Sequence, residues 1–249
     1  MTDKPKQRVL LIQVRAPDDL MLDHEFACVR SRFGDRQLNL TRRNAVVDVA
    51  DPRWLDDVDG VVIGGSGDFS VHHPKSQPWV TPLRAVIDGI LSNDIPCFAI
   101  CFGHQLLGQH LGNDVITDPN HAELGTVTVE LTETGHRSAL FQDFQPRFRV
   151  HSGHSDHVSG VPPGVDLLAS NAATATQAFH VRGSRVYSVQ FHPDMTGAEA
   201  RYRYLAYRQG FAERLDPSAE SKADMFLPDQ DESTELLGRF FDVCLSQKE

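Results

Sequence analysis

The sequence contains few cysteines and no long hydrophobic run. Its 249 residues include 4 cysteines, none of them in a CxxC pair, which is too few for a disulfide scaffold in a chain of this length. The first apolar run, Val9–Ile12, is far shorter than the ~20 residues that a membrane helix needs, and no signal-peptide pattern accompanies it. We therefore expect a cytoplasmic protein without a membrane partner.

Basic residues are also in the minority. The chain has 24 Lys and Arg against 34 Asp and Glu, a formal net charge of −10. An acidic surface repels phosphate backbones, so nucleic acid is not an expected partner. The loose group of arginines between residues 30 and 43 is typical of a solvated face.

The first half alternates buried strands with amphipathic helices. Strands are predicted over 9–14, 37–41, 59–63 and 95–100, and helices over 19–33, 79–92 and 103–111. This order predicts an α/β fold with a mostly parallel central sheet and helices on both faces.

The second half is richer in alternating β-forming segments, which predict an antiparallel extension of the same sheet. They lie at 124–132, 148–151, 166–169, 178–181 and 186–191. A helix is then expected from Gly197 to Leu215, with Tyr202, Leu205 and Phe211 as packing positions, followed by a loop over 216–230 and a last helix over 231–246. Because nothing resembles an interdomain linker, we expect one domain over 1–249, with its core at about 8–195 and a helical extension at about 196–249.

The strongest local pattern surrounds Cys101. The buried strand Pro96–Ile100 runs directly into Cys101 and then into a predicted helix, which is the arrangement of a nucleophile elbow with sulfur in place of oxygen. A helix N-terminus stabilises a thiolate through its dipole and free N–H groups, and the N–H of Phe102 can bind an oxyanion. The alternative is a buried small hydrophobic residue, which is the interpretation that we prefer for the other three cysteines.

A cysteine nucleophile needs a base, and His192 is the best candidate among the 12 histidines. It follows the predicted strand 186–191, and Asp194 can orient its imidazole and stabilise the cation, as in a catalytic triad. A histidine that merely ends a strand is the alternative, but the pairing with the Cys101 elbow favours catalysis.

Two glycine- and histidine-rich segments are further candidates. Gly64–Gly67 follows a strand but lacks the ending of a phosphate-binding loop, so Gly65 is better explained as a second oxyanion donor than as part of a generic turn. His151–His157 places histidines at three-residue spacing without matching a zinc pattern. We expect a loop at a strand end there, and no metal.

Together these motifs resemble the class I, triad-type glutamine amidotransferase family. The resemblance covers roughly residues 8–195 and is carried in order by Gly64–Gly67, Ile100–Gln105, His154–Asp156 and Phe191–Asp194. The likeness is strongest to stand-alone members whose loops resemble the amidotransferase domain of GMP synthase, a group that includes γ-glutamyl peptide hydrolases. It implies a flavodoxin-like sheet.

The resemblance also implies a role for each motif residue. Cys101 attacks the γ-carboxamide of glutamine, or of a γ-glutamyl amide, and forms a γ-glutamyl thioester. His192 serves as base and acid and is oriented by Asp194, while Gly65 and Phe102 supply the oxyanion N–H groups. No cofactor is implied, and the glutamyl part of the substrate is bound by Gln105 and by the backbone of Ser155 and Asp156.

Two positions depart from the family pattern. The family usually has Glu after His-Pro, where this chain has Asp194, which is one methylene shorter; the reach of the carboxylate is therefore in question. The family loop usually reads His-Gly, where this chain has His154-Ser155. If that position needs a positive φ, Ser155 is strained.

Three functions fit these patterns. The first is a free-standing cysteine hydrolase that releases glutamate and ammonia or an amine. The second is an ammonia-donating subunit that depends on a synthase, since the chain has no Ser-Gly-Gly-x-Asp-Ser nucleotide loop of its own. The third is a catalytically degenerate amidotransferase fold used for binding or regulation. The C-terminal extension offers a surface for a synthase or a homodimer, or it simply covers the sheet.

A fourth group, the related α/β stress proteins and peptidases with a cysteine elbow, fits less well. These proteins share the elbow, but a distant His-Pro-acid motif on a late strand is more typical of amidotransferases.

Overall fold

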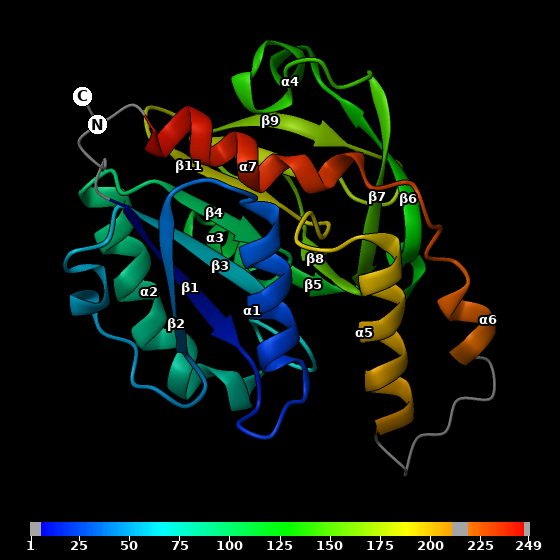
Figure 1. The fold of residues 1–249 in the computed structure, drawn as a ribbon, viewed down its shortest axis with the longest axis horizontal. Coiled ribbons are helices and arrows are strands. Elements are labelled where there is room, and N and C mark those ends of the chain that lie inside the picture. The colour runs from blue at the N-terminus through cyan, green and yellow to red at the C-terminus, as the bar shows by residue number, and fades with distance from the viewer. Residues whose placement is uncertain (1–5, 211–218, 247–249) are drawn as a thin grey trace.

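A long twisted sheet organises the molecule, and helices cover both of its faces (Figure 1). The computed structural model describes residues 6–210 and 219–246. Nine strands form the sheet in the order β2-β1-β3-β4-β11-β10-β9-β6-β7, and β5 and β8 form a separate pair. The strands are β1 Gln7–Val14, β2 Leu38–Asn44, β3 Gly60–Ser66, β4 Cys97–Ile100, β5 Val115–Thr117, β6 Glu123–Leu131, β7 Arg147–His154, β8 Asp156–Val158, β9 Val165–Ser170, β10 Ala178–Val181 and β11 Val186–Val189.

The sheet has a parallel part and an antiparallel part. Strands β2, β1, β3, β4 and β11 run parallel to one another, whereas β11, β10, β9, β6 and β7 pair antiparallel. Parallel neighbours need crossover connections, which the helices of the first half supply. The predicted α/β architecture with an antiparallel extension is therefore confirmed.

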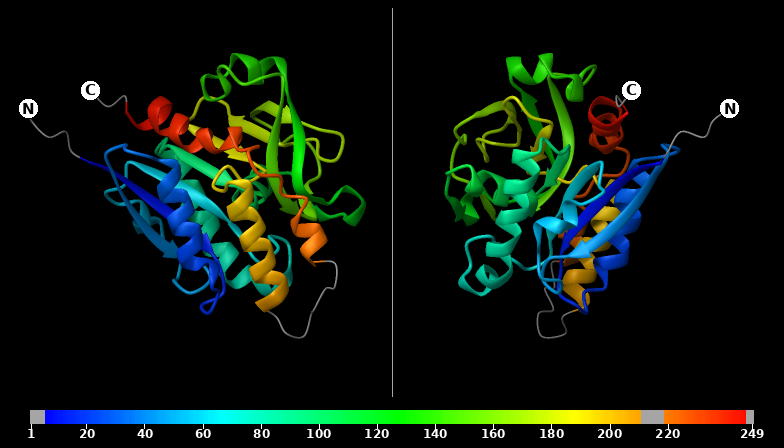
Figure 2. Two further views of the ribbon diagram at one scale, coloured as in Figure 1. Left: turned by 45° about the vertical axis from the view of Figure 1, so that its right-hand side comes forward. Right: turned by 90° about the vertical axis from the view of Figure 1, so that its left-hand side faces the viewer.

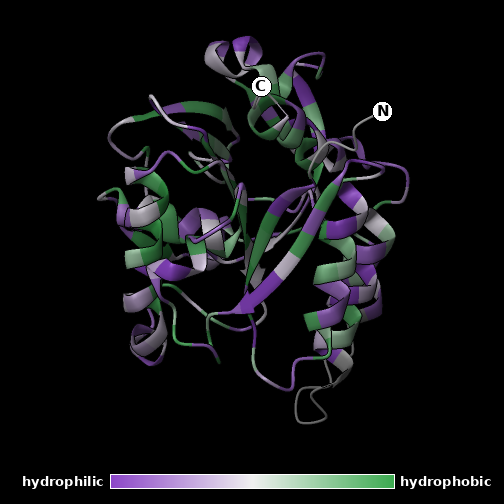
Figure 3. Ribbon diagram, turned by 60° about the vertical axis from the view of Figure 1, so that its left-hand side comes forward, coloured by the Kyte–Doolittle hydropathy of each residue, from purple (hydrophilic) through white to green (hydrophobic). Residues whose placement is uncertain are grey.

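Two hydrophobic cores lie on opposite faces of this sheet because successive strand residues point to opposite sides. In β1, Val9 and Leu11 face the core shared with α1 and α7, and Leu10 and Ile12 face the core shared with α2 and α3. Figure 2 shows these two helix layers from the side, and Figure 3 shows the largely hydrophobic strands between them. The helices are α1 Met21–Arg32, α2 Gln77–Ser92, α3 Phe102–His110, α4 Glu133–Arg137, α5 Gly197–Gly210, α6 Ala219–Ala223 and α7 Leu236–Phe240.

The C-terminal region differs most from the sequence prediction. The short helix α6 lies inside the predicted loop 216–230, and the predicted last helix is divided into a 3-10 turn, α7 and a π-helical turn at Phe241–Leu245. On α5, Tyr202 is 57% exposed rather than packed, and the buried side of that helix carries Ala200 and Arg203 instead. Residues 211–215 of the predicted helix, with Phe211, lie outside the described residues.

None of the helices in residues 6–210 and 219–246 is long and apolar enough to cross a membrane.

Candidate active site

The strand register brings the three motifs to one edge of the sheet. Ile100 at the end of β4 is paired with Val189 at the end of β11, and Ala99 is paired with Ile63 of β3. Because these neighbouring strands are parallel, the residues that follow them emerge at the same edge. Cys101 therefore lies between the Gly65 strand and the His192 strand.

Cys101 occupies the elbow that the sequence predicts. Its backbone has φ 48° and ψ −98°, a left-handed conformation that side chains rarely adopt, and it is the residue before helix α3. Its N–H donates to Val189 O at 2.9 Å, which fixes the turn to the adjacent strand. Gly103 makes the tight turn possible, since a Cβ there would lie 2.7 Å from Ile63 O.

His192 and Asp194 form the expected pair. Asp194 Oδ1 lies 2.9 Å from His192 Nδ1, and both side chains are buried. The shorter carboxylate therefore reaches the imidazole without the extra methylene of glutamate. Cys101 lies within hydrogen-bonding reach of the same ring.

The charges of this pair stabilise one another. Burial alone lowers the pKa of His192, but the Asp194 carboxylate and the Cys101 sulfur outweigh burial and raise that pKa to about 9. Burial raises the pKa of Asp194, yet the charges of His192 and Arg203 hold it well below its usual range. The arrangement therefore favours an imidazolium beside two anionic partners, which is the state that a cysteine nucleophile requires.

Gly65 lies against both reactive side chains. A Cβ at Gly65 would be 2.8 Å from His192 Cε1 and 3.6 Å from Cys101 Cβ. Only glycine fits here without displacing the imidazole. Its backbone and that of Phe102, the first residue of α3, border Cys101 from two sides.

Gln105, Ser155 and Asp156 also come together. Gln105 lies one turn into α3, and its Nε2 donates to Asp156 O at 2.7 Å and to Gln190 Oε1 at 3.3 Å. Ser155 is not among the residues with positive φ, so replacing the family's glycine causes no strain there. Gln190 Nε2 is buried and has no partner among the described residues, which makes it a polar group near Gln105 that the sequence analysis did not single out.

The remaining histidines of the His151–His157 segment have protein partners. His151 Nε2 lies 2.8 Å from Asp231 Oδ1, and His154 Nε2 lies 3.0 Å from Glu123 Oε2. Within residues 6–210 and 219–246, no group of three or more His, Cys, Asp or Glu side chains is arranged to hold a metal ion.

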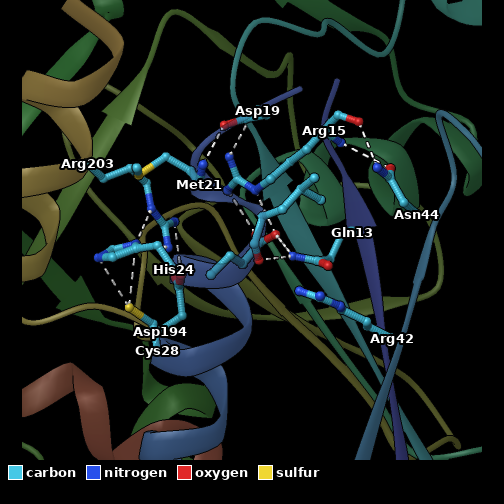
Figure 4. A network of polar contacts seen from close by, with 12 residues as sticks. Gln13, Arg15, Asp19, Met21, His24, Cys28, Arg42, Asn44, Asp194 and Arg203 are labelled. Atoms are coloured by element: carbon cyan, nitrogen blue, oxygen red, sulfur yellow. Dashed lines mark hydrogen bonds and ion pairs between the residues drawn. The ribbon is translucent and has the colours of Figure 1, made fainter. Parts of the chain in front are cut away.

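Arg203 of α5 is a site residue that the sequence analysis missed. Its Nη1 lies 3.1 Å from Asp194 Oδ2, and both side chains are almost completely buried. Figure 4 shows Arg203 and Asp194 beside His24 of α1, with Arg15 at the other end of the same polar network. An arginine inside a helix is ordinarily solvent-facing, so the sequence alone carried no pattern that would identify it.

Comparison with known proteins supports the geometry. The model of the glutamine amidotransferase class-I family matches residues 27–208. The chain belongs to the class I glutamine amidotransferase family. This amidotransferase is 30% identical over 145 residues to a glutamine-hydrolyzing GMP synthase subunit from Sulfolobus acidocaldarius, covering 58% of this chain and 72% of the relative. It is 26% identical to the subunit of the same name from Thermoplasma volcanium, covering 68% and 81%.

Longer relatives match only in part. The amidotransferase is 27% identical to a glutamine-hydrolyzing GMP synthase from Shewanella putrefaciens, where the match covers 74% of this chain but 37% of the relative. Among solved structures, a glutamine amidotransferase from Thermotoga maritima has the same fold, with a TM-score of 0.71, 22% identity and coverage of 96% and 98%. A second, from Methylobacillus flagellatus, has a TM-score of 0.65 and 23% identity, with coverage of 94% and 91%.

Proposed function

We propose that this amidotransferase hydrolyses the γ-carboxamide of glutamine, or of a γ-glutamyl amide, through a γ-glutamyl thioester. The observation that carries the proposal is the alignment of Cys101, His192 and Asp194 at one sheet edge, with Asp194 Oδ1 2.9 Å from His192 Nδ1. A cysteine–imidazole pair oriented by a carboxylate is the arrangement for nucleophilic acyl transfer.

The proposed reaction has two halves. The Cys101 sulfur attacks the γ-carbonyl carbon, the carbonyl oxygen becomes an oxyanion, and the backbone N–H groups of Gly65 and Phe102 bind it. His192 gives its proton to the departing nitrogen, so that ammonia or an amine leaves and the thioester remains. His192 then takes a proton from water, which attacks the thioester and releases glutamate and free Cys101.

The glutamyl pocket is proposed beside Cys101 on α3. Gln105 and the backbone of Ser155 and Asp156 border it, because Gln105 already bonds Asp156 O. The orphaned Gln190 Nε2 is a further donor for a substrate oxygen. No cofactor is needed for any step.

A second candidate is the same glutaminase chemistry in a protein that passes ammonia to a synthase. It is favoured by the relatives that are named as GMP synthase subunits, and by the longer GMP synthases, of which the chain covers 24–37%. A homodimer is another possible assembly for such a chain.

Glutamate release by the purified chain tests these alternatives. We expect Cys101→Ala to abolish release from glutamine, glutathione and a γ-glutamyl dipeptide, whichever of them the wild type hydrolyses. Turnover of peptides supports a free-standing γ-glutamyl hydrolase, and turnover of glutamine alone supports an ammonia donor. Release that survives Cys101→Ala contradicts the proposed nucleophile. No release by the wild type, alone or with a captured synthase, supports a degenerate binding protein.

A further inference from the structure

The carboxylate of Asp194 is held at both oxygens. Oδ1 lies 2.9 Å from His192 Nδ1, and Oδ2 lies 3.1 Å from Arg203 Nη1. Asp194 and Arg203 side chains are 2% and 6% exposed. Because water barely reaches the pair, the direction of the carboxylate is set by these two partners.

Arg203 is itself held from a second element. Its Nη2 and Nε lie 3.3 and 3.4 Å from His24 Nδ1 of α1. One turn further along α5, Tyr207 donates to Asp19 Oδ2 at 2.9 Å and is contacted by Arg15. Figure 2 shows α5 lying beside α1, so the guanidinium is fixed by contacts on both sides.

We propose that Arg203 is a positioning residue for the triad, which turns the short carboxylate of Asp194 so that Oδ1 meets His192. The proposal rests on the catalytic role proposed above for His192. An aspartate in place of the family's glutamate has less reach, and a cation on its far oxygen prevents it from turning away from the imidazole.

The charge of Arg203 matters as well as its shape. Removing it leaves Asp194 buried with one partner fewer, so the pKa of Asp194 moves upward, toward protonation at moderate acidity. The nearby charged or titratable groups from the other elements are His192, Cys101, Arg15, His24, Cys28, Glu199 and Tyr207.

The test compares two replacements of similar length at this position of the helix. Arg203→Met keeps the apolar stem and removes the charge, whereas Arg203→Lys keeps a cation that can reach one carboxylate oxygen. Arg201→Met is the matched control, because Arg201 is 40% exposed and pairs with Asp224 away from the site. The readouts are kcat and KM for glutamate release, and the pH dependence of Cys101 alkylation by iodoacetamide without substrate.

We expect Arg203→Met to lower kcat by about 10- to 100-fold with KM changed less than about twofold, because the residue orients a group that does not touch substrate. Arg203→Lys should recover part of the loss. In Arg203→Met the acidic limit of fast Cys101 alkylation should move to higher pH, and in Arg201→Met it should stay in place.

Two results would overturn the proposal. One is an unchanged alkylation profile in Arg203→Met. The other is an equal loss in the Lys and Met variants that follows their melting temperatures, since that pattern describes helix docking alone. If wild type releases no glutamate, the proposed function fails, but the alkylation profile still decides the role of Arg203.

Discussion

The four cysteines differ in their surroundings far more than in their burial. Burial raises the pKa of Cys28 and of Cys244 to about 12, and that of Cys97 higher still. Cys101 instead lies at the start of α3 in contact with His192. A thiolate is the reactive form of cysteine, so the structure separates one reactive sulfur from three inert ones.

This difference predicts selective labelling. A limiting dose of iodoacetamide at pH 6.5 should modify Cys101 first, faster than it modifies free cysteine, and peptide mapping by mass spectrometry should find the other three unmodified. Cys101→Ser is the control and should show no fast label. Labelling spread over several cysteines at similar rates would contradict the assignment.

At single positions, the sequence was most informative where a short motif carried the chemistry. Cys101, His192 and Asp194 could be predicted because strand, elbow and His-Pro-acid spacing are local. Arg203 could not, because its importance depends on the packing of α5 against α1, which no local pattern encodes. Tyr202 was wrongly expected to be packed for the same reason, since a one-residue difference on a helix moves a side chain by about 100°.

Among the elements, the contact of α3 with β3 determines where Cys101 lies. Gly103 is the point of closest approach, where a Cβ would be 2.7 Å from the Ile63 carbonyl oxygen. Backbone cannot yield as a flexible side chain does, so added volume here separates the helix from the strand.

We therefore expect Gly103→Ala to lower the free energy of unfolding by about 1–3 kcal/mol and to reduce glutamate release with it. Urea unfolding measures the first effect. The matched control is Gly153→Ala in β7, where a Cβ meets nothing within 4 Å, and alanine should leave stability unchanged or slightly higher. Similar losses in both variants would show that the approach of α3 to β3 is not the cause.

The main strands and helices could be predicted because buried parallel strands are continuous apolar runs. The short strands β5 and β8 escaped prediction, since residues such as Ile116 and Thr117 face solvent and show no apolar period. The helix α6 escaped as well, because its polar sequence Ala219–Ala223 reads as a loop. Its place is set by Met225, whose carbonyl accepts from Thr126 N of β6 at 2.8 Å.

For the molecule as a whole, the buried triad couples folding to pH. The pKa of His192 is raised from 6.5 to about 9 by the fold, so the folded state favours the imidazolium. Its contribution to stability is fully present below about pH 6.5 and is lost as pH rises through about 9. At about 1.4 kcal/mol per pKa unit, the contribution is about 3 kcal/mol.

Urea unfolding at pH 6.5 and at about pH 10 measures this coupling. The wild type should lose about 3 kcal/mol more than His192→Gln between the two values. The same loss in both proteins would assign the pH dependence to other groups.

The single-domain organisation and the cytoplasmic location stay predictions. The sheet does run without interruption from β2 to β7, which explains why no linker is visible in the sequence. The antiparallel extension was predictable only as a class, because its strand order β10-β9-β6-β7 depends on long-range pairing that local patterns do not specify.

The backbone conformation of Cys101 bears on the history of this chain. A left-handed conformation costs a residue with a Cβ about 1–2 kcal/mol, and glycine avoids that cost. Any lineage in which binding alone were selected would gain stability by replacing this cysteine with glycine, and random substitution supplies that change readily. A cysteine retained at φ 48° is thus a mark of continuing selection for turnover, and it weighs against a protein that has given up catalysis.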